Sequence, residues 1–168
     1  IAERRQRQQP PLVFATVFPF SMHNYLLRYW LAACGIDPDN DLQLIVIPPA
    51  QMVSHLRDGR IDGYCVGEPW NAAAVHEGIG RTLMTTYEIW NNAPEKVLGV
   101  NQEWAEQHPE THLALITALL EAMIWLDEPA NRPEAVTLLS RGEYVNAPAE
   151  LVRMSLLGTY QFARNEFP

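Results

Sequence analysis

The chain has 168 residues, of which 48% are hydrophobic and 19% are charged, and its formal net charge at pH 7 is −8. This is the composition of a globular protein that forms one domain or parts of two. The acidic balance and the lack of a basic stripe argue against nucleic acid as a partner. The longest apolar run, around residues 115–125, is broken by polar residues and is too short to span a bilayer, so we expect no membrane insertion of this segment.

The first residues are polar, and the first apolar run starts only at Leu12. A signal peptide would show a basic start followed by an apolar stretch, which this segment lacks. We therefore interpret residues 1–11 as a linker or the tail of a helix. The start at Ile1 rather than at a methionine suggests a C-terminal fragment of a longer protein.

Apolar, β-rich runs alternate with helical patterns over the first hundred residues. Strands are predicted at 12–18, 42–47, 62–66, 82–89 and 96–100, and helices at 23–33, 50–56 and 69–78. Continuously apolar strands that alternate with helices predict a parallel sheet covered on both faces.

The character of the sequence changes after Val100. Helices are predicted at 104–127, with an interruption at Pro109, and at 133–141 and 148–160. This break indicates that the chain leaves one domain and contributes helices to another.

Three segments run from a strand through a short turn into a helix, at Val17–Asn24, Ile45–Gln51 and Cys65–Trp70. Ligands of open α/β sheets bind outside the carboxyl ends of the strands, and helix N-termini there favour small anions. Ser21 is placed to cap the first helix, and His23 lies in its first turn.

Each candidate also has an ordinary structural interpretation. A histidine in a helix turn often has no ligand, and a lysine such as Lys96 is usually solvated. What favours a binding site is that the carboxyl ends of all three strands are expected at the same edge of the sheet.

Cys34 and Cys65 lie in apolar settings and are predicted to be buried thiols rather than a disulfide framework, which favours a cytoplasmic location. An enzyme with Cys65 and His23 as nucleophile and base, or a metal site of histidines with Glu68, is an alternative. No motif of a hydrolase, metalloprotease or phosphate-binding loop supports it. We therefore expect no catalytic residue, no metal and no cofactor.

Five separated motifs occur in an order that resembles the nitrate/bicarbonate solute-binding family of ABC transporters, over roughly residues 14–160. The family also includes a cytoplasmic nitrate/nitrite sensor. The motifs are SMHN at 21–24, YWLA at 29–32 with GIDP at 35–38, IPPAQMV at 47–53, DGYCVGEPW at 62–70, and EIW at 88–90 with PEKVLG at 94–99.

The resemblance implies an α/β, periplasmic-binding-protein-like (type II) clamp of two lobes with the anion between them. Residues 12–95 would form the second lobe, a parallel-rich sheet flanked by helices. Residues 96–168 would supply a return strand and an all-helical segment that belong to the first lobe, whose N-terminal half is absent. We therefore expect the 168 residues alone to bind the anion poorly.

By the same resemblance, His23, Lys96 and Gly67 match residues that contact the anion, and we include Glu68 and Ser21 in the predicted site. Nitrate-type members carry lysine at the Lys96 position and bicarbonate-type members glutamate, so nitrate or nitrite is favoured over bicarbonate. Met22 stands where many members have threonine, which removes one hydroxyl donor.

Glu68 would repel an anion if it were ionised beside it. Three interpretations remain open: it caps its own helix, it pairs with Lys96 or His23, or it contacts a second ligand such as a metal ion that accompanies bicarbonate.

The resemblance leaves two kinds of protein partner. One is the set of membrane subunits of an ABC transporter, with the protein periplasmic or membrane-anchored. The other is a regulatory protein that a cytoplasmic nitrate sensor releases when its lobes close on the anion. The thiols and the segment FSMHNY at 20–25 favour the cytoplasmic sensor.

Overall fold

The computed structural model describes residues 1–164 of the chain. Contacts within the chain divide it into two compact units. Unit 1 is formed by Ile1–Ala93 together with the segment from Tyr160 on, and unit 2 by Pro94–Thr159.

A three-stranded parallel sheet lies at the centre of unit 1. Its strands are β1 (Leu12–Thr16), β2 (Leu42–Val46) and β3 (Gly63–Cys65), in the order β2-β1-β3. The register pairs Leu12 with Leu42 and Phe14 with Gly63. All three strands therefore end at the same edge of the sheet, as the alternating pattern predicts.

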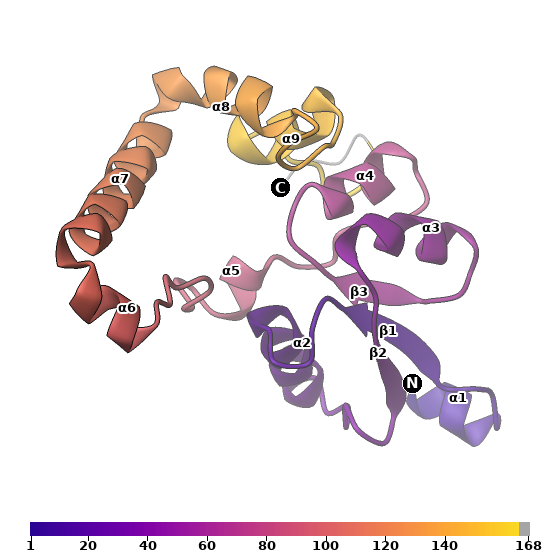
Figure 1. Ribbon diagram of the computed structural model, residues 1–168. Coiled ribbons are helices and arrows are strands. Elements are labelled where there is room, and N and C mark those ends of the chain that lie inside the picture. The colour runs from indigo at the N-terminus through magenta and orange to yellow at the C-terminus, as the bar shows by residue number, and fades with distance from the viewer. Residues whose placement is uncertain (165–168) are drawn as a thin grey trace. The chain divides into compact units, whose positions relative to one another are not determined.

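Helices cover both faces of this sheet (Figure 1). On one face, α2 (Met22–Ala33) packs Leu27 and Leu31 against Leu42 and Phe14. On the other face, the core gathers Ala15, Met52 and Val66, with Trp70 packed against them. The remaining elements of unit 1 are α1 (Ala2–Gln6), η1 (Pro49–Gln51), α3 (Met52–Arg57), α4 (Trp70–His76) and α5 (Thr86–Ile89).

The predicted strands at 82–89 and 96–100 are wrong. Thr86–Ile89 forms α5, which starts with a capping box in which Thr85 and Glu88 exchange side-chain and backbone hydrogen bonds. Residues 96–100 have no regular secondary structure. A strand needs a neighbour to bond its backbone, and among the described residues β3 pairs only with β1.

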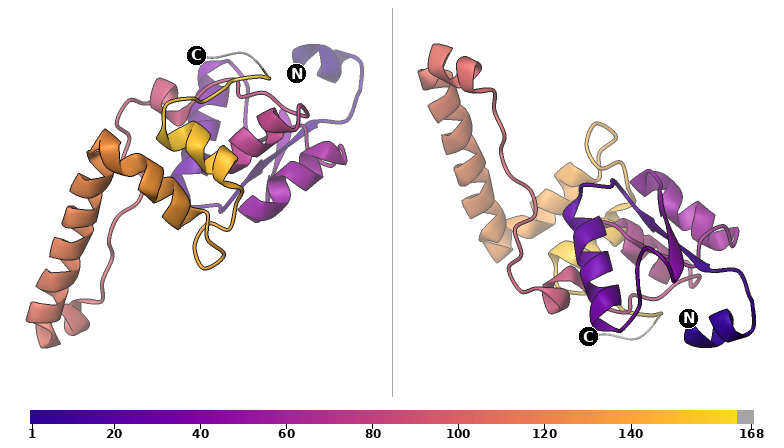
Figure 2. Two further views of the ribbon diagram at one scale, coloured as in Figure 1. Left: turned by 90° about the horizontal axis from the view of Figure 1, so that it is seen from above. Right: turned by 90° about the horizontal axis from the view of Figure 1, so that it is seen from below.

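Unit 2 is helical, as predicted. It contains α6 (Gln102–Gln107), α7 (Pro109–Asp127), η2 (Pro129–Asn131), α8 (Arg132–Leu139) and α9 (Ala149–Leu156). Its core is a small cluster around Val136, Ala147 and Val152. The long helix α7 (Figure 2) has no buried residue, although it carries apolar side chains such as Met123 and Ile124. Within residues 1–164, no helix is both long enough and apolar enough to cross a bilayer.

The two cysteines are less buried than predicted. Neither is in a disulfide, but Cys34 is exposed and Cys65 is only partly buried. Cys34 is the C-cap residue of α2, one position beyond its last helical turn, and so it escapes the cover that the sheet gives to Leu31.

Gly80 is a position where the packing of unit 1 leaves no room for a side chain. A Cβ atom there would lie 3.0 Å from Leu56 Cδ2 and 3.2 Å from Ala74 Cβ. We expect Gly80→Ala to lower the free energy of unfolding by about 1–3 kcal/mol, because both neighbours must shift. Urea denaturation measures this change. Gly99→Ala is the control, since no atom lies within 4 Å of its added Cβ, and equal stability of the two variants would contradict the prediction.

Candidate functional site

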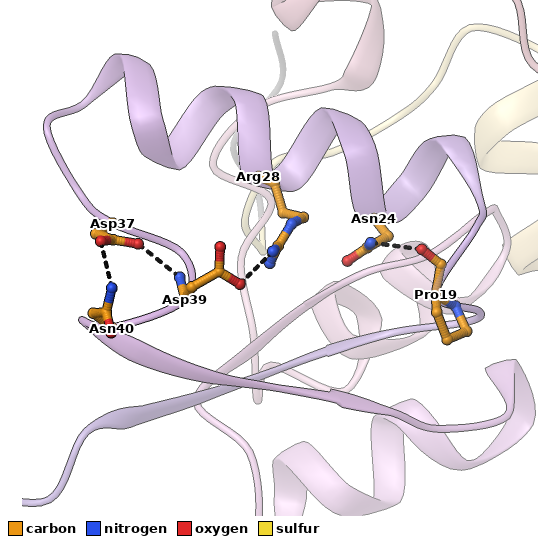
Figure 3. Close-up of polar contacts among 6 residues, drawn as sticks. All are labelled: Pro19, Asn24, Arg28, Asp37, Asp39 and Asn40. Carbon is orange, nitrogen blue, oxygen red and sulfur yellow. Dashed lines mark hydrogen bonds and ion pairs between the residues drawn. The ribbon is translucent and has the colours of Figure 1, made fainter.

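The start of α2 is held by two polar side chains. Ser21 is the N-cap residue, as predicted: its Oγ accepts a hydrogen bond from the Asn24 backbone N–H at 3.3 Å and donates to the Phe18 carbonyl oxygen at 2.8 Å. The Asn24 amide nitrogen also donates to the Pro19 carbonyl oxygen at 2.7 Å (Figure 3). Because the Ser21 hydroxyl proton is used within the turn, Ser21 shapes the helix start.

The far end of α2 is held by charged side chains. Arg28, on the helix, pairs with Asp39 in the following loop (Figure 3). Asp37 accepts hydrogen bonds from the Asn40 side chain at 2.7 Å and from the Asp39 backbone N–H at 2.9 Å. Asn24 and Arg28 thus tie α2 to the loops that precede and follow it.

Two of the predicted site residues lie next to each other. His23 is in the first turn of α2, and Gly67 follows β3. A Cβ atom at Gly67 would lie 3.8 Å from His23 Nε2, with no other atom outside its chain neighbours within 4 Å. The α2 N-terminus adds partial positive charge at this point. The carboxyl ends of β1 and β3 thus bring together the His23 imidazole, the backbone of Gly67, which has no side chain, and the N-terminus of α2.

Glu68 turns its carboxylate toward its own helix. Oε2 accepts a hydrogen bond from the Ala72 backbone N–H at 3.0 Å, and Oε1 accepts one from the Asn71 side-chain amide at 2.9 Å. The Asn71 amide also donates to the Val66 carbonyl oxygen at 2.8 Å. These bonds are those expected from the helix-capping interpretation, although the N-cap position itself is occupied by Pro69, behind a cis peptide bond.

The Tyr160 hydroxyl lies 2.6 Å from Thr82 Oγ1. The Glu68 residue retains exposed surface, yet the protein around its carboxyl desolvates it enough to raise its pKa, against the opposing effect of the hydrogen bonds from Ala72 and Asn71. Desolvation likewise raises the pKa of Tyr160. The Ala72 N–H and the Asn71 amide therefore hold this carboxylate in a partly dehydrated position.

Lys96 is the only lysine in the chain and belongs to unit 2. Its Nζ lies 2.5 and 2.8 Å from the two carboxylate oxygens of Glu95, and its side chain is 80% exposed. Its expected approach to His23 remains a prediction, because the two residues belong to different units.

A cavity of about 390 Å³ lies elsewhere in unit 1, beside β3. Trp30, Tyr64 and Met84 are among its mostly apolar lining, and none of the five predicted site residues lines it. An anion needs hydrogen-bond donors and positive charge, which the strand ends supply better. The described part of the chain contains no group of three or more metal-ligating side chains.

Sequence reasoning missed two side chains that shape this region, Asn71 and Tyr160. Asn71 had a local signal, since it lies three residues after Glu68 and within reach of it across the turn. Tyr160 had none, because 78 residues separate it from Thr82, its hydrogen-bond partner.

A family model described as the NMT1-like family matches residues 1–140. The bicarbonate transport ATP-binding protein CmpC of Synechococcus elongatus is 54% identical over 143 residues, which is 85% of this chain and 22% of CmpC. The nitrate/nitrite binding protein NrtA of the same organism is 40% identical over 162 residues, which is 96% of this chain and 37% of NrtA.

The crystal structure of the periplasmic nitrate-binding protein NrtA from Synechocystis PCC 6803 has the same fold. It matches with a TM-score of 0.90 and 36% sequence identity, over 98% of this chain and 42% of that one. This likeness confirms the predicted periplasmic-binding-protein-like fold. The chain spans less than half the length of each of these relatives.

The raised pKa of Glu68 predicts how stability changes with pH. The folded state favours the protonated carboxyl, so this contribution to stability is complete below the ordinary pKa of 4.5 and is lost as the pH rises through the raised value. We expect the unfolding free energy of the wild type, relative to Glu68→Gln, to fall as the pH rises from below 4.5 toward neutrality.

Urea denaturation across this pH range measures the effect. Glu134→Gln, which removes an exposed carboxylate of α8, controls for the loss of one negative charge. A difference between wild type and Glu68→Gln that is flat, or that rises with pH, would contradict the prediction.

Proposed function

Because the chain belongs to the NMT1-like family, we propose that it forms part of a two-lobed clamp that binds a small inorganic anion, nitrate or nitrite in preference to bicarbonate. The observation that carries this proposal is the approach of His23 Nε2 to Gly67 at the first turn of α2. An imidazole N–H and the backbone of a residue without a side chain suit a small planar anion that needs several donors within a narrow space.

Lys96 supplies the full positive charge in this proposal. The chain as a whole is acidic, with a net charge of −8, so a single ammonium near the anion has a strong effect on selectivity. Nitrate and nitrite are weakly hydrated and have no proton to donate, so an ammonium suits them, whereas bicarbonate also suits a carboxylate acceptor. The names of the relatives divide between bicarbonate and nitrate, and the charge at position 96 therefore decides our choice.

Glu68 and Ser21 serve the site without touching the anion. Ser21 caps α2 and thereby orients the helix turn that carries His23. Each oxygen of the Glu68 carboxylate accepts a hydrogen bond from the first turn of α4, which keeps its negative charge directed at the N-terminus of that helix. In this proposal the clamp binds the anion and catalyses no reaction. Its lobes close on the anion, and a partner protein responds to the closed form.

A second candidate function follows from the identity with an ATP-binding protein. CmpC, at 54%, is more similar to this chain than the free-standing binding protein NrtA, at 40%. As the second candidate we propose a clamp that reports the anion to the ATP-binding subunit of a transporter, a sensing function, in place of one that delivers the anion to the membrane subunits.

Thermal unfolding of the full-length parent polypeptide with nitrate, nitrite, bicarbonate or sulfate tests the binding function. A ligand that binds only the folded state stabilises it by about 2.7 kcal/mol at a hundred times its dissociation constant. We expect nitrate or nitrite to raise the melting temperature of the wild type but not that of His23→Ala or Lys96→Glu.

Two variants control for nonspecific effects. His76→Ala removes an exposed histidine of α4, and Arg141→Glu makes the same change of charge as Lys96→Glu at an exposed position of unit 2. A shift with bicarbonate alone would mean that Lys96 does not select nitrate, and no shift with any anion would reject the proposed function.

Hydrolysis of ATP by the full-length parent, measured with and without nitrate, separates the two candidate functions. Sensing predicts a rate that changes with nitrate in the wild type and does not change in His23→Ala, because the anion must close the clamp to act. A parent that binds nitrate but shows no nitrate-dependent hydrolysis would favour delivery to a transporter.

A further inference from the structure

The cavity beside β3 is enclosed by segments of unit 1 that are far apart in the sequence. Its lining includes Phe14 of β1, Trp30 of α2 and Leu56 of α3, together with residues of β3 and of the segment 79–89. Its volume of about 390 Å³ is typical of a small-molecule site. An engineered apolar cavity of about 150 Å³ in another protein binds benzene, so this cavity has room for two fused aromatic rings.

The wall that the segment 79–89 contributes is held in place by hydrogen bonds to a distant part of unit 1. The Thr82 backbone N–H donates to the Phe162 carbonyl oxygen at 2.7 Å, and Thr82 Oγ1 lies 2.6 Å from the Tyr160 hydroxyl. The capping box of α5 fixes the start of that helix, which carries two further lining residues. The cavity is therefore formed before a ligand binds, as is usual for small-molecule sites.

Three polar side chains of the lining already form hydrogen bonds within the protein. The Tyr64 hydroxyl donates to the Trp70 carbonyl oxygen at 3.0 Å. The Asn71 amide donates to the Val66 carbonyl oxygen at 2.8 Å. The Asp62 carboxylate accepts a hydrogen bond from a backbone N–H of β1 at 2.8 Å. A ligand rich in polar groups would lose its hydrogen bonds to water here without regaining as many from these side chains.

The rings and charges of the lining indicate what kind of ligand fits. Phe14, Trp30 and Tyr64 are aromatic, and aromatic rings favour a further ring packed edge to face or offset against them. Asp62 and Arg81 bring formal charges of opposite sign, which cancel. An ion would lose its hydration in the cavity without gaining a net opposite charge, so the lining favours a neutral ligand.

We propose that this cavity is a second ligand site of unit 1, which takes a neutral aromatic molecule of about two fused rings. The ligand packs against the aromatic side chains and is covered by the segment 79–89. The inference is independent of the proposed anion binding, because neither His23, Gly67 nor Lys96 lines the cavity.

The test uses the full-length parent polypeptide and two probes that share one ring system. At neutral pH 2-naphthol is uncharged, whereas 2-naphthoate is an anion. Binding is followed by NMR of the methionine methyl groups, because the ring current of a bound probe shifts nearby methyl signals. Met84 lines the cavity, and Met123 is an exposed residue of α7 that does not.

The matched variants are Thr86→Trp and Thr111→Trp. Thr86 is the first residue of α5 and lines the cavity, so a tryptophan there occupies the space of the ligand. Thr111 is an exposed residue of α7 outside the cavity, where the same exchange leaves that space unchanged. Both variants keep Met84 as the reporter of binding.

We expect 2-naphthol to shift the Met84 methyl signal of the wild type and to leave that of Met123 in place. Its affinity for Thr86→Trp should fall at least about tenfold, while its affinity for Thr111→Trp should equal that of the wild type. The wild type should bind 2-naphthoate at least about tenfold more weakly than 2-naphthol, because the anion must lose its hydration.

Each contrary result overturns a stated part of the inference. A Met84 signal that 2-naphthol does not move would reject the site, and this measurement needs only the wild type should Thr86→Trp fail to fold. Equal affinity of 2-naphthol for Thr86→Trp and Thr111→Trp would place the ring outside the cavity. Equal affinities of the wild type for 2-naphthol and 2-naphthoate would reject a neutral ligand.

Discussion

Parallel pairing of β1 with both of its neighbours is the constraint on which the rest of unit 1 depends. It forces the loops after all three strands to the same edge of the sheet, where α2 and α4 begin. His23 and Gly67 are 44 residues apart in the sequence, and they meet only because β1 and β3 are adjacent and run in the same direction. Within residues 1–164 the sheet has three strands, and helices pack on both of its faces.

A carboxylate beside a proposed anion site would be costly if it were free to approach the ligand. Glu68 avoids this cost because its oxygens accept hydrogen bonds from the Ala72 N–H and the Asn71 amide. The same two donors explain why its charge is tolerated where desolvation raises its pKa. The Glu68 carboxylate, which could repel the anion, is instead hydrogen-bonded within its own turn and so stabilises the turn that contains Gly67.

The sequence correctly predicted those strands and helices whose signals lie within a few neighbouring residues. The apolar runs marked β1, β2 and β3, and Ser21 marked the start of α2. The prediction failed at residues 82–89, where an apolar, β-rich composition outweighed the Thr85–Glu88 capping box in our interpretation. It also could not find Tyr160 as a neighbour of Thr82, since no periodicity links residues so far apart. The expected role of Lys96 depends on the other unit and stays a prediction.

The return of the chain at Tyr160 has a consequence for the order in which the protein folds during synthesis. Unit 1 is discontinuous, and the partners of Thr82 at Tyr160 and Phe162 are translated only after the whole of unit 2. Contacts of such long sequence separation are slow to form, because the loop between them must first be closed. The β1–β3 sheet can assemble on the ribosome early, but Thr82 acquires its partners at Tyr160 and Phe162 only when the helices of unit 2 have already emerged.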